Sequence, residues 1–105
     1  MTDCIQEYRE RFGDTWADGL ERAPIPDHMK PGIVRYVIRG VAPGHFLQAV
    51  FKNDLMAALQ RADDTNKRLL WEYGNILYNY TPVGCYGSDE KFKAWVEAGG
   101  ANGIV

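Results

Sequence analysis

The sequence has few of the side chains that most often build a catalytic or metal site. It holds two cysteines, Cys4 and Cys85, and two histidines, His28 and His45, and no two of these four stand at a spacing typical of metal ligands. A cysteine nucleophile would need the fold to bring Cys85 near a histidine, and nothing in the local sequence supports that. The glycines match neither a phosphate-binding loop nor a dinucleotide fingerprint. The sequence therefore predicts no metal, no cofactor and no enzymatic activity.

Long apolar runs are also absent. No stretch approaches the roughly 18 consecutive apolar residues of a membrane-spanning helix, and the first four residues are polar and acidic where a signal peptide would be basic and then apolar. A chain of this length can build a core without a disulfide, so reduced thiols are a simpler interpretation than a bridge between Cys4 and Cys85. We therefore expect a cytoplasmic protein with no membrane segment.

The overall composition is that of an ordinary globular protein. The 105 residues are 46% hydrophobic and 25% charged, which is too apolar for a disordered chain. A chain of this size has room for one hydrophobic core. We expect residues 1–105 to form a single helical domain, with an N-terminal helix and linker over 1–25, a helical body over 26–98 and a flexible tail over 99–105.

Apolar residues recur every three or four positions along most of the chain, which is typical of amphipathic helices. Residues 31–39 are rich in β-branched side chains, so a strand is the alternative to a helix there. The predicted fold class is all-α, a compact bundle of about five short helices, with residues 69–80 and 46–59 at the centre of its core. The apolar spacing predicts helices over residues 2–21, 31–39, 46–51, 55–62, 65–80 and 89–98.

Charge is unevenly distributed along the chain. Residues 1–27 hold seven acids and three bases, whereas residues 28–53 hold no acid and four bases: Lys30, Arg35, Arg39 and Lys52. Such a basic segment can bind the phosphates of a nucleic acid. The alternative, which we favour, is that the acidic N-terminal segment packs nearby and neutralises it. A helix-turn-helix over residues 43–62 is disfavoured because Arg61 is the one base of its second helix.

Aromatic side chains mark the outer side of the helix predicted over residues 65–80. Trp71 and Tyr78 lie seven residues apart and away from its main apolar stripe, and Gly74 between them leaves room for close approach. Either a surrounding bundle buries both sides of this helix, or the two rings belong to a surface that binds a partner. Because aromatic residues are enriched at binding hot spots, the candidate interaction residues are Trp71, Tyr78, Tyr86 and Trp95.

A pattern of short strings runs from about residue 26 to residue 97. It consists of Arg35-Tyr36, Pro43-Gly44 with Phe46-Leu47 and Ala49-Val50, Asn53-Asp54-Leu55, Arg61-Ala62-Asp63 with Asn66, Tyr78-Asn79, Pro82 and Cys85-Tyr86-Gly87-Ser88. This pattern resembles that of small uncharacterised proteins carried by bacteriophages and prophages, which more often have Trp at the position of Tyr86. Residues 1–25 lie outside the resemblance.

The resemblance implies an accessory protein that acts in the cytoplasm of an infected or lysogenic bacterium, where such products often bind and redirect a host protein. The function we expect is a non-enzymatic protein-interaction module, whose partner is a host protein or a second copy of the chain in a homodimer. The alternative is a nucleic-acid-binding accessory factor that uses the basic segment 28–53.

Overall fold

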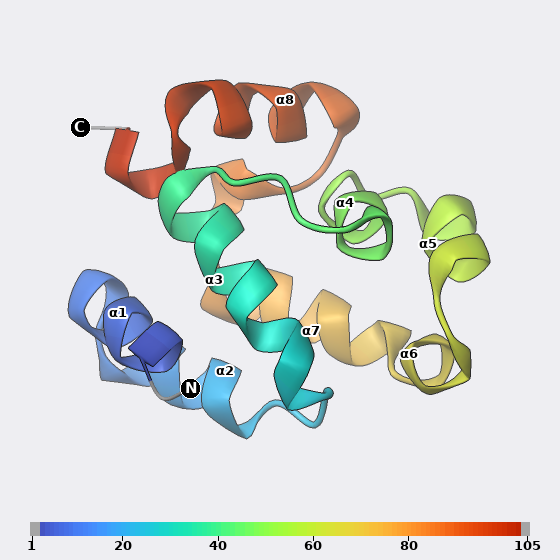
Figure 1. The fold of residues 1–105 in the computed structure, drawn as a ribbon, viewed down its shortest axis with the longest axis horizontal. Coiled ribbons are helices and arrows are strands. Elements are labelled where there is room, and N and C mark those ends of the chain that lie inside the picture. The colour runs from blue at the N-terminus through green and yellow to red at the C-terminus, as the bar shows by residue number, and fades with distance from the viewer. Residues whose placement is uncertain (1–2, 104–105) are drawn as a thin grey trace.

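The computed structural model describes residues 3–103, and within that range the secondary structure is helical with no strand. The predicted all-α class is confirmed, but the predicted number of helices is wrong, since residues 3–103 form eight α-helices in place of about five. Three short 3-10 helices connect or extend them (Figure 1). In chain order the elements are α1 (Asp3–Phe12), α2 (Asp14–Arg22), η1 (Asp27–Met29), α3 (Lys30–Arg39), α4 (His45–Phe51), α5 (Leu55–Arg61), α6 (Asp64–Arg68), α7 (Leu70–Tyr80), η2 (Val83–Cys85), α8 (Asp89–Ala98) and η3 (Gly100–Gly103).

The single helix predicted over residues 2–21 is divided at Gly13. Its φ of +97° is a conformation that glycine adopts without steric cost, so α1 ends there and α2 leaves in a new direction. The turn brings α2 against α7, where the Tyr80 ring lies so close to Gly19 that a Cβ on Gly19 would overlap it. The predicted start of this helix at Thr2 lies outside the described residues.

The single helix predicted over residues 65–80 is divided at Leu69. The Asp63 carboxylate accepts a hydrogen bond from the backbone N–H of Asn66 and so fixes the start of α6. The backbone N–H of Leu69 then bonds to the carbonyl of Asn66, three residues back, which tightens the last turn and ends the helix. α7 begins at Leu70 in a different direction (Figure 1), and this break and the one at Gly13 turn the six helical segments predicted from apolar spacing into eight.

The central element of the core is α3, which Figure 1 shows crossing the middle of the molecule. The alternative of a strand over residues 31–39 is excluded, because this segment is helical and ends at Gly40 in the left-handed conformation. Residues 69–80 and 46–59, which the sequence predicts at the centre of the core, contribute buried side chains such as Phe51 and Tyr73 and share the core with α3. Six of the ten residues of α3 are buried: Ile33, Val34, Tyr36, Val37 and Ile38 of its apolar arc, and the charged Lys30.

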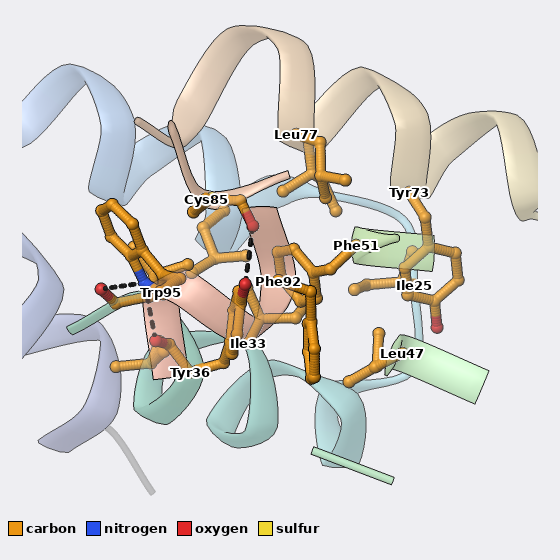
Figure 2. Close-up of a cluster of buried hydrophobic side chains, with 14 of the residues drawn as sticks. Ile25, Ile33, Tyr36, Leu47, Phe51, Tyr73, Leu77, Cys85, Phe92 and Trp95 are labelled. Carbon is orange, nitrogen blue, oxygen red and sulfur yellow. Dashed lines mark hydrogen bonds between the residues drawn. The ribbon is translucent and has the colours of Figure 1, made fainter. Parts of the chain in front are cut away.

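Hydrogen bonds from two buried aromatic side chains connect α3 to the C-terminal half of the chain (Figure 2). The Tyr36 hydroxyl donates to the carbonyl of Cys85 at 2.7 Å. Trp95 Nε1 on α8 donates to the carbonyls of Tyr36 and Val37 at 3.1 and 3.2 Å, where α3 approaches its end. Cys85 is a free thiol and fully buried, and burial raises its pKa to about 11.

The end of the described chain is packed against α3. Gly99 ends α8 at a φ of +83°, and residues 100–103 form η3, in which Ala101 is buried. The backbones of Gly40 and Gly100 touch, leaving no room for a Cβ on either. Residues 99–103 belong to the segment predicted as a flexible tail, and here they are packed against α3, because two facing glycines allow a close backbone contact that local sequence does not reveal. Residues 104–105 lie outside the described residues.

Candidate protein-interaction surface

One side of α7 is buried in the core and the other faces solvent. Tyr73, Ile76 and Leu77 are buried, whereas Trp71 is 69% exposed and Tyr78 is 80% exposed. The question raised by the sequence is thereby answered, since the bundle does not bury both sides of this helix. Two large aromatic side chains exposed two turns apart on one helix are unusual, because large rings bury most of their surface when a core is available to them.

An apolar groove lies beside these two rings, between α5 and α7. Its volume is about 270 Å³, and we call it the α5–α7 groove. The one charged residue that lines it is Asp54, whose carboxylate accepts a hydrogen bond from the backbone N–H of Ala57 and so caps α5. Its main apolar lining comes from Val50 of α4, Leu55 and Ala58 of α5, and Leu70, Gly74 and Leu77 of α7.

Gly74 joins the groove to the aromatic pair. At 100° per residue it lies about 40° around α7 from Leu70, which lines the groove, and about 40° from Tyr78 on the other side. A Cβ on Gly74 would meet no atom within 4 Å, and its φ is not among the positive values of the chain. Neither packing nor backbone conformation therefore requires a glycine. A glycine inside a helix lowers its stability relative to alanine. At position 74 the absence of a side chain leaves an open, flat stretch of surface.

Exposed apolar side chains continue the surface on α5. Leu55 lines the groove and is 60% exposed, and Met56, the next residue, is 66% exposed. The spacing of both residues fits an amphipathic helix, so the sequence did not predict their exposure. The signal was Asp54, which fixes the start of a helix so short that its first turn reaches beyond the core. We call the groove together with Leu55, Met56, Trp71 and Tyr78 the α5–α7 surface.

The other two predicted interaction residues have different positions. Tyr86 is half-buried and lines the α5–α7 groove, so it belongs to the surface. Trp95 does not, because it is 7% exposed and its N–H donates to two carbonyl oxygens of α3. Trp95 shares an apolar stripe with Phe92, and this position indicates its buried role better than its aromatic character indicated a role in binding. Trp95 is a core residue and is removed from the set.

Most of the predicted basic face is neutralised within the fold. Lys30 is buried, with Nζ 3.0 Å from Asp27 Oδ1 and a hydrogen bond of 2.7 Å to the carbonyl of Glu21. Arg39 forms an ion pair with Glu7 of the acidic N-terminal segment. These contacts match the alternative that we favoured from the sequence, in which the two segments pack together.

The remaining bases of the segment behave differently from each other. Lys52 Nζ lies 3.2 Å from Asp89 Oδ1 and 5.0 Å from the centre of the Phe92 ring. Hydrogen bonds from Lys93 and Lys52 lower the pKa of Asp89, as expected for a carboxylate between two ammonium groups. Arg35 is exposed and makes no ion pair with any residue from 3 to 103. Of the four predicted bases it alone stays open to a ligand.

Two further properties concern the described part of the chain. It contains no group of three or more His, Cys, Asp or Glu side chains placed to hold a metal ion. None of its helices combines the length and the apolar character needed to cross a bilayer. Comparisons with protein-family models, with curated proteins and with solved structures gave no significant match.

Proposed function

We propose that this chain is a non-enzymatic protein-interaction module that binds its partner through the α5–α7 surface. The observation that carries the proposal is the exposure of Trp71 and Tyr78 on either side of Gly74, next to an apolar groove. Aromatic rings contribute large apolar areas to an interface and have few rotatable bonds to order on binding. A water-exposed pair of this kind becomes favourable once a partner covers it.

An amphipathic helix is the occupant that the surface suits best. The groove runs between two helices, and its one charged lining residue, Asp54, is already engaged as a helix cap. The contact face of the partner would therefore be apolar, as in other complexes where a helix lies in a groove. Gly74 allows the backbone of such a helix to approach α7 closely. A second copy of α7 offers such a face, so a homodimer is one form of the same proposal.

The biological setting comes from the resemblance over residues 26–97 to small phage and prophage proteins. In that setting the partner is a host protein in the bacterial cytoplasm. The nucleic-acid alternative through Lys30, Arg35, Arg39 and Lys52 has less support, because three of these four bases are already paired within the fold.

The proposal is tested by comparing three forms of the protein. They are the wild type, the double variant Trp71→Ser with Tyr78→Ser, and the control Val41→Ser, which alters an exposed apolar residue that does not line the groove. Each form is used to capture proteins from a bacterial lysate and is also analysed by sedimentation velocity for self-association.

The expected result is a captured protein, or a dimer, that the wild type and Val41→Ser share and that the double variant loses. Thermal unfolding must give the same midpoint for the double variant and the wild type, since both altered side chains are exposed. If capture and self-association are the same for all three forms, the α5–α7 surface is not the binding site.

A further inference from the structure

Two bases that form no ion pair in residues 3–103, Arg35 and Arg61, meet at a second place in the molecule. A cavity of about 390 Å³ is lined by His28 of η1, Arg35 of α3, His45 of α4 and Arg61 of α5. Neither arginine forms an ion pair in the described range, and no hydrogen bond of either side chain appears there. Four elements that are far apart in the sequence thus bring four nitrogen-bearing side chains to one site.

The one carboxylate that lines this cavity is that of Asp63. Its Oδ1 accepts the backbone N–H of Asn66 at 2.8 Å, so part of its charge is used to cap α6. Two guanidinium groups therefore face a single acid. The lining has an excess of positive charge even with both imidazoles neutral, which favours an anionic ligand.

A buried amide supplies a further donor at the same cavity. Asn66 is 5% exposed and lines the cavity, and its Oδ1 accepts a hydrogen bond of 2.7 Å from the Tyr73 hydroxyl. Within residues 3–103 the Nδ2 group of Asn66 has no hydrogen-bond partner. Every fully buried side-chain nitrogen or oxygen in that range does have a hydrogen-bond partner. The Nδ2 group must therefore retain accessible surface, and the cavity is the surface that Asn66 lines. Tyr73 holds this amide with its N–H groups available to a ligand.

We propose that this cavity binds a phosphate group, either of a small phosphate compound or of a nucleic acid. The planar fork of a guanidinium matches phosphate oxygens, and two such forks with an amide can surround one phosphate. The volume lies within the range of small-ligand sites. The site is separate from the α5–α7 surface, and either can fail without the other.

This site differs from the basic face that the sequence suggested. Arg35, His28 and His45 belong to the basic segment, but its other bases Lys30, Arg39 and Lys52 do not line the cavity, whereas Arg61 and Asn66 from outside the segment do. In the sequence Arg61 is the one base of its segment and does not by itself indicate a binding helix. Its place at the cavity becomes visible only when the fold brings residues of α3, α4 and α5 to the same cavity.

The test is a calorimetric titration with inorganic phosphate at constant ionic strength, with chloride as the reference anion. It is applied to the wild type, to Arg35→Gln, to Arg61→Gln and to Arg68→Gln. Arg68 is a matched control, because it is an exposed arginine that does not line the cavity. Arg35→Gln and Arg61→Gln each remove one charged hydrogen-bond donor, so each variant should bind phosphate roughly ten-fold more weakly than the wild type. The affinity of Arg68→Gln should equal that of the wild type.

A second titration distinguishes the two sources of phosphate. A nucleoside monophosphate and a DNA duplex without terminal phosphates are added to the same four proteins. Loss of duplex binding in Arg35→Gln and Arg61→Gln assigns the site to a nucleic acid, and loss of binding to the monophosphate alone assigns it to a small ligand. The proposal is overturned if phosphate does not bind the wild type saturably, or if Arg68→Gln weakens binding as much as the cavity variants.

Discussion

Gly74 provides the sharpest test of how the α5–α7 surface works. The glycine lies inside α7, has open space where a Cβ would be and adopts no positive φ. The substitution Gly74→Ala should therefore raise the free energy of unfolding by about 0.5 to 1 kcal/mol, the usual advantage of alanine inside a helix. For a domain of this size that corresponds to a rise of roughly 2 to 8 °C in the melting temperature.

The same substitution should weaken binding at the surface. A methyl group on Gly74 stands between the groove and the aromatic pair and keeps a partner helix further from α7. Gly74→Leu should weaken binding more than Gly74→Ala. Asn75→Ala is the control, because Asn75 is exposed on α7 and lines no part of the groove.

Circular dichroism during heating measures the stability of each variant, and the capture and sedimentation experiments measure binding. Stability and binding should change in opposite directions for Gly74→Ala. A loss of stability would show that the space beside Gly74 is not open. A gain in stability with unchanged binding would show that the missing side chain has no part in recognition, and the role given to Gly74 would then be wrong.

Three other predictions concern the framework. Gly100→Ala should lower the free energy of unfolding in urea by about 1 to 3 kcal/mol or more, because Gly100 has a φ of +72° and touches the backbone of Gly40. Gly44→Ala is the control, since its Cβ would lie in open space and should change the stability little. Trp95→Phe should lower the free energy of unfolding by about 1 to 3 kcal/mol in the same assay, since it removes the indole N–H that donates to two carbonyls of α3. An unchanged unfolding midpoint would contradict these two hydrogen bonds. Cys85 should react with a thiol reagent at pH 8 only in denaturant, because its thiol is buried with a pKa of about 11, and rapid labelling of the folded protein at this residue would refute its burial.

Local sequence signals were sufficient to predict several helices of the fold. Gly40 takes the left-handed conformation that ends α3, and the side chains of Asp54 and Ser88 cap α5 and α8 as their residue types suggest. The breaks at Gly13 and Leu69 were not predicted. A glycine or a leucine inside an apolar repeat is compatible with a continuous helix, and packing of α2 on α7 favours the bend instead.

The two candidate sites differ in how much of each the sequence could reveal. Trp71 and Tyr78 were found because their position on one helix is enough to separate them from the core stripe. The groove beside them needed the placement of α5 against α7, and the cavity around Arg35 and Arg61 needed four elements to meet. Ion pairing could not be read from composition either, since Arg39 and Glu7 are 32 residues apart.

Photocrosslinking in bacterial cells tests the central claim most directly. Benzoylphenylalanine is introduced by the substitution Tyr78→benzoylphenylalanine in one form and Lys93→benzoylphenylalanine in another. Both side chains are exposed, but Lys93 lies on α8 and does not line the groove. If the α5–α7 surface binds a protein, irradiation should give a discrete adduct from position 78 and none from position 93. No adduct from position 78, or the same adducts from both positions, would contradict the proposed role of this surface.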